Sequence, residues 1–454
     1  MKRLALIDVV GLTTGLIQQH GTFLKKWSEH KSVSTFEPAF PAVTTTAQST
    51  YLTGAPPSEH GIVGNGWYDR IDAEHKFWKQ SNHLVRGEKV WETLKKENPD
   101  FTCAKLFWWY NMYSSADYTI TPRPMYPADG RKVFDVYTQP MGMREEIKAD
   151  LGDFPFFTFW GPKAGIPCSQ WIANSTKWVE EKHQPDLNLI YLPHLDYILQ
   201  QEGPGGENVP SEFKKIEDLL EDLITYLEAR DIEVMIVSEY GISEVNHPIH
   251  LNRLFRQEGW ITIKDELGKE QLDLGASKVF AIADHQVAHI YLNDLSLKDQ
   301  VRVLLENTPG IESVHDGKAE FGSGLGGERG GDLIVESTSD AWFTYYYWLD
   351  DAVAPDFARC IDIHRKCGYD PAELFIDPEI KLPPLKIAQF LLKKKLGFRT
   401  LMDIIPLDAS LVKGSHGRRN VPTEEQPLFI GKEQINEATA VHSQILKHFS
   451  APTS

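Results

Sequence analysis

Short apolar runs alternate with amphipathic segments along most of this chain, and this alternation limits the fold more than any other feature. The first run, Leu4–Ile7, ends at Asp8, where polar loop residues begin, as expected of a buried strand. Between the runs, apolar residues recur at helical spacing, most clearly over Ser211–Ala229. Strands that alternate with helices form a mostly parallel sheet with helices on both faces. The predicted fold class is therefore α/β.

The predicted elements cover most of the chain. Strands are expected at Leu4–Ile7, Thr102–Phe107, Leu187–Leu192, Glu233–Val237, Val279–Ala283, His289–Leu292 and Leu333–Val335. Helices are expected at Thr45–Leu52, Lys89–Lys95, Gln170–Glu181, Ser211–Ala229 and Leu297–Glu306. We expect one domain over residues 1–449 with insertions at about 117–166 and 341–398, and a frayed tail at 450–454. The second insertion ends in a basic helix, LKIAQFLLKKKLGF.

Charge and composition narrow the class of protein. The 454 residues include 47 Lys and Arg against 64 Asp and Glu, a net charge of −17. Apart from Lys393–Lys395 no basic patch interrupts this acidity, so a nucleic acid polymer is not an expected partner. No stretch reaches the roughly 18 apolar residues of a membrane span. Asp8 interrupts the apolar start, unlike a secretion signal, and four cysteines without a CxxC pair favour a cytoplasmic location.

Asp8 and Thr44 are the first candidates for chemistry. Ligands of open α/β sheets bind at the carboxyl ends of the strands, and Asp8 stands at such an end. Pro41 and Val43 lead into a threonine-rich turn, Thr44–Thr46, before a helix-compatible stretch. A hydroxyl at a helix N-terminus suits a nucleophile, because the helix dipole stabilises an attacking alkoxide or a bound phosphate. A turn aspartate and an ordinary threonine cap are the alternative interpretations.

The segment Phe40–Arg70, FPAVTTTAQSTYLTGAPPSEHGIVGNGWYDR, resembles the alkaline phosphatase superfamily, in particular its nucleotide pyrophosphatase/phosphodiesterase and phosphonoacetate hydrolase branch. That branch shares a metal-binding Asp after the first strand, a Pro-x-x-Thr nucleophile turn, a Thr-Gly followed by Pro, and a His-Gly-Ile followed by Asn. Here these are Asp8, Pro41 with Thr44, Thr53-Gly54 with Pro56, and His60–Ile62 with Asn65. The resemblance implies a Thr44 nucleophile and, at Asn65, an oxyanion donor that binds the phosphoryl oxygen.

The resemblance extends over most of the chain and contains two departures. In YLPHLDYILQQEGP, Asp196 matches a metal-binding Asp, but Gln200 stands where the family has His. In VSEYGI, Glu239 and Tyr240 stand where the family has Asp and His. In GSHG, His416 matches the last metal-binding His.

Two divalent metal ions are implied by this resemblance. A pair of ions neutralises the phosphoryl oxygens, and one ion deprotonates the nucleophile. The family's mixture of carboxylate and imidazole suits zinc, whereas the harder ligands of this chain favour manganese, iron or magnesium. The implied ligands are Asp8, Thr44, Glu239 and Tyr240 for one ion, and Asp196 and His416 for the other.

Another imidazole is expected to replace the one missing at Gln200. His364 is the leading candidate, because Asp356, Asp362 and His364 are close together in a segment that is otherwise apolar. A lone histidine is more often structural, and the weaker candidates are His194, His247, His250 and His285, which follows Asp284.

The implied activity is phosphoester hydrolysis. The leading hypothesis is a metal-dependent phosphoesterase that transfers the phosphoryl group of a phosphodiester or a nucleotide pyrophosphate to Thr44 and then to water. A phosphonate C–P hydrolase and a phosphotransferase or mutase are alternatives. A non-catalytic phosphate-ligand binding protein is the alternative from another class. The expected partner is a small phosphate ester or phosphonate.

Overall fold

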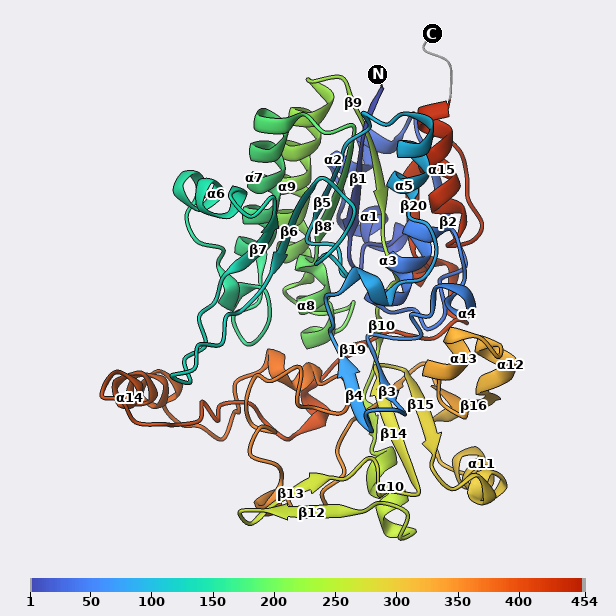
Figure 1. Cartoon of the computed structure of the whole chain (residues 1–454), viewed down its shortest axis with the longest axis vertical. Coiled ribbons are helices and arrows are strands. Elements are labelled where there is room, and N and C mark those ends of the chain that lie inside the picture. The colour runs from blue at the N-terminus through green and yellow to red at the C-terminus, as the bar shows by residue number, and fades with distance from the viewer. Residues whose placement is uncertain (1, 451–454) are drawn as a thin grey trace.

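The fold is built on one large sheet. A computed structural model describes residues 2–450, so the predicted tail lies outside the described residues except for Ser450. The sheet has eight strands in the order β2-β20-β9-β1-β8-β5-β6-β7 (Figure 1). Its central strands are parallel, and β20 and β7 run antiparallel to their neighbours. The strands are β1 (Arg3–Val9), β2 (Ser32–Thr35), β5 (Cys103–Leu106), β6 (Tyr118–Pro122), β7 (Val136–Gln139), β8 (Leu187–Leu192), β9 (Ile232–Val237) and β20 (Leu428–Gly431).

Helices cover both faces of this sheet, which confirms the predicted α/β class. α7 (Ile166–His183) and α9 (Val209–Glu228) lie on one face, and α3 (Thr44–Thr53), α5 (Val90–Glu97) and α15 (Ala440–Ser450) lie on the other (Figure 1). The apolar stripe of α9 is buried against the sheet, as its amphipathic spacing predicts. The remaining helices of this unit are α1 (Thr14–His20), α2 (Phe23–Ser28), α4 (Pro57–His60), α6 (Met143–Leu151) and α8 (His194–Glu202).

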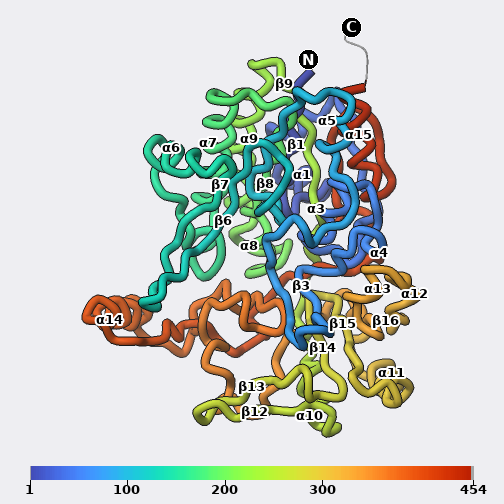
Figure 2. The backbone as a smooth tube through the Cα atoms, viewed as in Figure 1, coloured from blue at the N-terminus to red at the C-terminus, as the bar shows by residue number. Residues whose placement is uncertain are grey.

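A second sheet lies below the first in Figures 1 and 2. It has four antiparallel strands in the order β14-β15-β17-β16 and its own apolar core. Its strands are β14 (Val279–Asp284), β15 (Val287–Leu292), β16 (Ile311–Asp316) and β17 (Leu333–Ser337). Four short helices belong to this part of the chain, namely α10 (Leu251–Gln257), α11 (Lys298–Glu306), α12 (Gly317–Phe321) and α13 (Leu325–Arg329).

This second sheet corrects one expectation. The runs at 279–283, 289–292 and 333–335 are strands, as predicted, but they do not join the parallel sheet. The reason is the connection between β14 and β15, which consists of His285 and Gln286 alone. A two-residue turn returns the chain antiparallel to itself, whereas a parallel crossover needs a dozen or more residues.

The two stretches predicted as insertions differ in structure. Residues 117–166 add β6, β7 and α6 at one edge of the large sheet, whereas residues 341–398 form β18 (Ala341–Phe343), long connections and α14 (Pro383–Lys395). α14 projects from the rest of the molecule (Figure 2). The short paired strands are β3 (Gly66–Asp69) with β4 (Glu74–Phe77), β10 (Ser243–Glu244) with β19 (Gly414–Ser415), β11 (His247–Ile249) with β18, and β12 (Ile263–Glu266) with β13 (Lys269–Leu272).

Two further features concern the whole chain. All four cysteines are free thiols. Within residues 2–450, no helix has the length and apolar character that crossing a membrane requires.

Candidate functional site

The carboxyl ends of three neighbouring strands bring the predicted acidic residues together. Asp8 lies near the end of β1, Asp196 lies in the first turn of α8 after β8, and Glu239 follows β9. β1 pairs with both β8 and β9, so the three ends are adjacent. All three carboxyl groups are buried, with Asp8 and Glu239 fully enclosed. Three carboxyl groups therefore gather at one edge of the sheet.

Thr44 joins this cluster through Tyr240. Thr44 is the first residue of α3, and its hydroxyl lies 3.2 Å from the Tyr240 hydroxyl. Tyr240 in turn donates a hydrogen bond to Asp196 Oδ1 at 3.2 Å. Since the phenol has a single hydrogen, Thr44 is the donor in its contact with Tyr240. The hydroxyl hydrogen of Thr44 thus points along a chain of hydrogen bonds that ends at Asp196.

Gln48 connects the other two carboxyl groups. Its Nε2 donates to Asp8 Oδ2 at 3.2 Å and to Glu239 Oε1 at 2.8 Å. The backbone N–H of Trp109 donates to Gln48 Oε1 at 2.7 Å and so fixes the orientation of the amide. Sequence reasoning missed Gln48. Its spacing of four residues from Thr44 on a predicted helix puts both residues on one face and is the signal that would have found it.

Gln200 also contacts the cluster. Its Nε2 donates to Asp196 Oδ2 at 2.7 Å, and its Oε1 accepts a hydrogen bond from the Tyr369 hydroxyl at 2.9 Å. Together with the bond from Tyr240 to Oδ1, both carboxyl oxygens of Asp196 accept hydrogen bonds from the protein. In the resembling family, a His at the position of Gln200 would bind the same metal ion as the Asp. Here Gln200 hydrogen-bonds that carboxyl group directly.

His416 completes the cluster from the late GSHG segment. Its Nδ1 lies 2.7 Å from the carbonyl oxygen of Ala42, and because a carbonyl only accepts, Nδ1 carries the hydrogen. Nε2 is buried and has no hydrogen-bond partner among residues 2–450. The ring stacks on Tyr240 with centroids 3.5 Å apart and lies 3.8 Å from His285. A lone pair held in this way is typical of a metal-binding imidazole.

Asn65 is held by the tip of the second sheet. Its Oδ1 accepts from the Thr45 N–H at 3.1 Å, while its own N–H and Nδ2 donate to Asp284 at 2.7 and 3.1 Å. Asp284 also lies 2.8 Å from His285 Nδ1. His285 has a φ of 62° in the two-residue turn, a conformation that costs energy for a residue other than glycine. The turn between β14 and β15 thus supplies one wall of the site.

His364 is not brought to this cluster. Its side chain is exposed, and its Nδ1 lies 3.2 Å from the carbonyl oxygen of Phe77. His194 lies 3.0 Å from Glu212 instead. Of the histidines proposed as substitutes, His285 is the one whose ring contacts that of His416, at a tilt of 36°. The last two candidates, His247 and His250, lie at β11 and at the residue before α10.

We therefore expect His364→Ala to leave the bound metal content unchanged. The exposed imidazole contacts a backbone carbonyl and not the buried carboxyl groups. Elemental analysis of the purified variant beside the unmodified protein, after mild dialysis, measures the effect. A loss of about half the metal or more in His364→Ala would return this residue to the ligand set.

Burial raises the pKa of the three carboxyl groups of the cluster and of the neighbouring Asp284. It raises the pKa of Asp196 and of Glu239 to about 7 and that of Asp284 to about 6. Burial and then the charge of Glu239 raise the pKa of Asp8 well above its usual range. Burial lowers the pKa of His416 well below its usual range, so this imidazole is neutral. At neutral pH the cluster holds protons that exposed carboxyl groups would have lost.

These shifts predict that the metal-free protein loses stability relative to the variant Asp196→Asn, Glu239→Gln as pH rises from 6.5 to 8. Over this range the unfolded chain has already lost its carboxyl protons, while the folded protein still releases those of Asp196 and Glu239, whose pKa values are about 7. The contribution of these two groups to the free energy of unfolding therefore falls with pH. We expect the melting temperature in EDTA, measured relative to that variant, to drop by about 2 °C. The histidines are the same in both proteins, so their contribution cancels in the difference.

The matched measurement adds Mn²⁺ at pH 8. A cation that binds the ionised carboxyl groups stabilises the folded state, so the melting temperature should recover. A difference in melting temperature between the unmodified protein and the variant Asp196→Asn, Glu239→Gln that stays constant between pH 6.5 and 8 without metal would contradict the assignment of these protons.

One part of the cluster fits a divalent cation. Asp8 Oδ1 and Glu239 Oε2 are buried and have no hydrogen-bond partner in the described part of the chain, and hard oxygen atoms of this kind bind Mg²⁺ and Mn²⁺. Within residues 2–450, no three His, Cys, Asp or Glu side chains form a ready metal site. Gln200 and Tyr240 stand where two imidazoles would complete such a set. Asp8 and Glu239 therefore offer donors for one cation, and the partner-free Nε2 of His416 is a further donor in the described part of the site.

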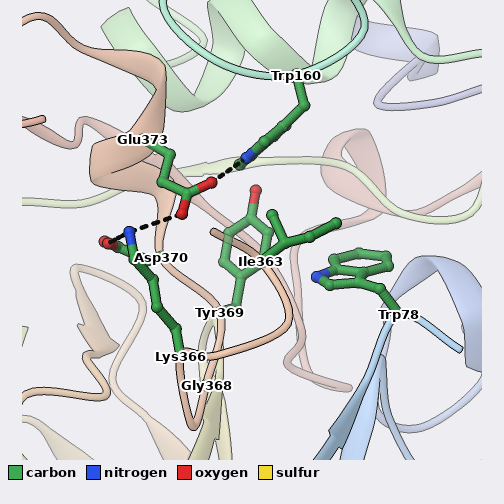
Figure 3. A pocket seen from close by; sticks show the side chains of 8 residues that line it. All are labelled: Trp78, Trp160, Ile363, Lys366, Gly368, Tyr369, Asp370 and Glu373. Carbon is green, nitrogen blue, oxygen red and sulfur yellow. Dashed lines mark hydrogen bonds and ion pairs between the residues drawn. The ribbon is translucent and has the colours of Figure 1, made fainter. Parts of the chain in front are cut away.

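A small pocket lies beside the cluster and is shown in Figure 3. A buried ion cluster forms one side of it, with Lys366 Nζ 2.7 Å from Asp370 and 2.6 Å from Glu373. Tyr369 connects the pocket to the site, because its ring also stacks on His285 with centroids 3.6 Å apart. The other lining residues are Trp78, Trp160, Ile363 and Gly368.

Comparison with known proteins shows which protein family this chain resembles. The sequence profile of the family described as type I phosphodiesterase/nucleotide pyrophosphatase matches residues 4–370. An uncharacterized pyrophosphatase/phosphodiesterase of Schizosaccharomyces pombe is 24% identical over 230 residues, which are 48% of this chain and 40% of that protein. Ectonucleotide pyrophosphatase/phosphodiesterase 2 of Saccharomyces cerevisiae is 23% identical over 221 residues, which are 46% and 39%. These matches span about two fifths of each relative's length.

Solved structures share the fold. Murine ectonucleotide pyrophosphatase/phosphodiesterase 5 superposes with a TM-score of 0.58 at 13% identity, over 99% of this chain and 95% of that chain. Phosphonoacetate hydrolase from Sinorhizobium meliloti 1021 superposes with a TM-score of 0.61 at 14% identity, over 97% and 94%. The profile match over most of the chain means that the chain belongs to the type I phosphodiesterase/nucleotide pyrophosphatase family.

Proposed function

We propose that the protein hydrolyses a phosphodiester or a nucleotide pyrophosphate with Thr44 as the nucleophile. The observation that carries this proposal is the position of the Thr44 hydroxyl, at the start of α3 and hydrogen-bonded to Tyr240 beside three buried carboxyl groups. The family supplies the reaction class. A structure of murine ectonucleotide pyrophosphatase/phosphodiesterase 5 holds AMP in a threonine-to-alanine variant described as inactive, which supports a nucleotide-like substrate and a threonine nucleophile.

The hydrogen bonds of Thr44 supply a path for its proton. As Thr44 Oγ1 forms a bond to phosphorus, its proton passes to Tyr240 while the phenol proton passes to Asp196 Oδ1. The leaving oxygen departs with the electron pair of the broken P–O bond. Water then attacks phosphorus, and the bond to Thr44 Oγ1 breaks with its electron pair. Thr44 takes its proton back from Asp196 through Tyr240, and the proton lost by water goes to the leaving oxygen of the first step or to solvent. A pKa of about 7 suits Asp196 as a proton acceptor near neutral pH.

The remaining residues of the site orient the substrate. Asn65 uses one amide hydrogen on Asp284, which leaves the other for a phosphoryl oxygen. Asp8 and Glu239 are the residues that would hold a divalent cation. Such a cation supplies positive charge against the phosphoryl oxygens. Their oxygen ligands favour manganese, magnesium or iron over zinc, and we propose one ion at these two carboxyl groups where the resemblance implies two.

A second function, binding of a phosphate ligand without turnover, is supported by a specific observation. Gln48 donates to both Asp8 and Glu239, and Gln200 donates to Asp196. The carboxyl groups that would bind metal ions in this generally metal-dependent family therefore accept hydrogen bonds from neutral amides here. The retained Thr44 and the proton path through Tyr240 favour hydrolysis over this second function.

A substrate screen with metal analysis tests the proposal. The purified chain, treated with EDTA and then supplied with Mn²⁺, Mg²⁺ or Zn²⁺, is assayed with bis-p-nitrophenyl phosphate, p-nitrophenyl phosphate and phosphonoacetate. We expect diester hydrolysis that is strongest with Mn²⁺. Preference for phosphonoacetate would indicate C–P cleavage, and binding of AMP without turnover of any substrate would favour the non-catalytic function.

A further inference from the structure

α14 and the residues on either side of it expose an unusual number of large apolar side chains. α14 projects away from both sheets in Figures 1 and 2 and contains no buried residue. The apolar side chains in and beside it that are more than half exposed are Leu382, Leu385, Leu391, Leu392, Leu396, Phe398 and Leu401. Seven such residues within one short segment form a surface of the kind that marks an interaction site.

The exposed leucines of α14 have a preferred face. Leu385, Leu392 and Leu396 follow one another at spacings of seven and four residues and therefore form a stripe along the helix. Ile387 lies on another side and packs against a small core that includes Ile404 and Ile405. The helix is thus attached to the body through Ile387, and its leucine stripe is directed elsewhere.

The charge of this segment is opposite to that of the rest of the protein. Residues 381–401 contain no Asp or Glu, although the whole chain has a net charge of −17. Lys386 is paired with Asp403. The basic residues of the segment are Lys381, Lys386, Lys393, Lys394, Lys395 and Arg399. An acidic protein therefore carries one local positive surface, which attracts anionic partners.

Exposed leucines combined with lysines on one helix match the chemistry of an anionic lipid surface. The leucines enter the boundary between headgroups and acyl chains, while the long lysine side chains reach the phosphates. Apolar and basic side chains follow one another closely over Leu391–Phe398, and a flat bilayer accommodates such a surface without a shaped pocket.

We propose that residues 381–401 form a membrane-surface site that holds the protein on a bilayer containing anionic lipids. The site is separate from the Thr44 cluster, and the inference does not depend on the hydrolytic activity proposed above. The occupant to which the proposal commits is the lipid surface itself, because the exposed leucine stripe and the local positive charge together match it.

Vesicle co-sedimentation of the full chain tests this proposal. We expect binding to phosphatidylcholine vesicles that contain about a third phosphatidylglycerol and much weaker binding to phosphatidylcholine alone. The triple variant Leu385→Ser, Leu392→Ser, Leu396→Ser should lower the partition coefficient at least about tenfold. The variant Lys393→Gln, Lys394→Gln, Lys395→Gln should lower it by about a hundredfold on the anionic vesicles.

Leu267→Ser is the matched control. Leu267 is fully exposed in the turn of the β12–β13 hairpin, so this variant removes an exposed leucine without changing α14 and should bind vesicles normally. All the changed side chains are exposed, so melting temperatures should stay within about 1 °C of the unmodified protein.

Two results would overturn the proposal. The first is the absence of binding to either kind of vesicle, or binding that the leucine triple variant retains in full. The second is a concentration-dependent dimer, measured by light scattering, that the leucine triple variant abolishes while vesicles remain unbound. That second result would assign the surface to contact between two copies of the chain.

Discussion

Thr44→Ala is expected to lower kcat for bis-p-nitrophenyl phosphate by a factor of about 10³ or more. The change removes the oxygen that we propose attacks phosphorus, and removal of a nucleophile typically has an effect of this size. The fold should persist, because the Thr44 hydroxyl does not cap α3. Steady-state kinetics measure the loss of kcat, and a melting curve of the same preparation shows whether the fold persists.

Thr46→Ala provides the matched control for this experiment. Thr46 lies on the same turn of α3, and its buried hydroxyl has no hydrogen-bond partner among the residues that the structure describes. We expect Thr46→Ala to keep turnover within about threefold, since the hydroxyl contacts neither the proton path nor the carboxyl groups. If Thr44→Ala kept normal turnover while Thr45→Ala or Thr46→Ala lost it, the nucleophile would be assigned to the wrong threonine.

The second large effect concerns the metal. The double variant Asp8→Asn, Glu239→Gln should reduce the manganese content from about one ion per chain to less than about a tenth, because it removes both carboxylate ligands. Turnover should fall at least about a hundredfold with it. The double variant should also melt at a higher temperature than the unmodified protein in EDTA at pH 8, because it removes two fully buried carboxyl groups whose ionised forms repel each other.

Asp196→Asn distinguishes the two roles assigned to the acidic residues. It removes the proton acceptor and leaves Asp8 and Glu239 unchanged, so manganese content should stay near one ion per chain while turnover falls. Two ions per chain in the unmodified protein, or one ion lost in Asp196→Asn, would restore the two-ion site that the family motifs imply.

The four central strands of the large sheet, β9, β1, β8 and β5, could be predicted from the sequence because they are almost entirely buried, whereas the outer strands β2, β20, β6 and β7 were not predicted. The run Leu187–Leu192 coincides with β8, and Ser211–Ala229 differs from α9 by two residues at the start and one at the end. Such runs have a single stable environment, the interior of a parallel sheet. The strands of the second sheet were wrongly assigned to the parallel sheet, because β14 and β15 are also fully buried and apolar content alone does not indicate strand direction. The two-residue connection between these strands does indicate that they are antiparallel.

The site could be predicted in part from its motifs. Asp8, Thr44, Asp196, Glu239 and Tyr240 lie in motifs and at strand ends, where backbone topology alone brings them together. Gln48 was missed because its one signal, the spacing of four residues from Thr44, places it on the same helix face without indicating a role until its two carboxylate partners are known. His364 was favoured because acidic neighbours surround it in sequence, but the segment turns this side chain to the surface.

Asp284 and His285 show why the role of a single residue is hard to predict from the sequence. Their role depends on a hairpin tip from the second sheet meeting the loop that carries Asn65, about 220 residues earlier in the chain. A contact between distant segments of this kind leaves no local pattern in the sequence.

Trapping the covalent intermediate tests the central claim most directly. The protein is mixed with a diester substrate at high concentration, quenched in acid during turnover, digested and examined by tandem mass spectrometry. We predict a phosphoryl adduct on Thr44 that is absent from Thr44→Ala and from protein quenched before substrate is added. Hydrolysis at a normal rate with no adduct on the peptide that contains Thr44, or with the adduct on Thr45 or Thr46, would contradict the assignment of Thr44 as the nucleophile.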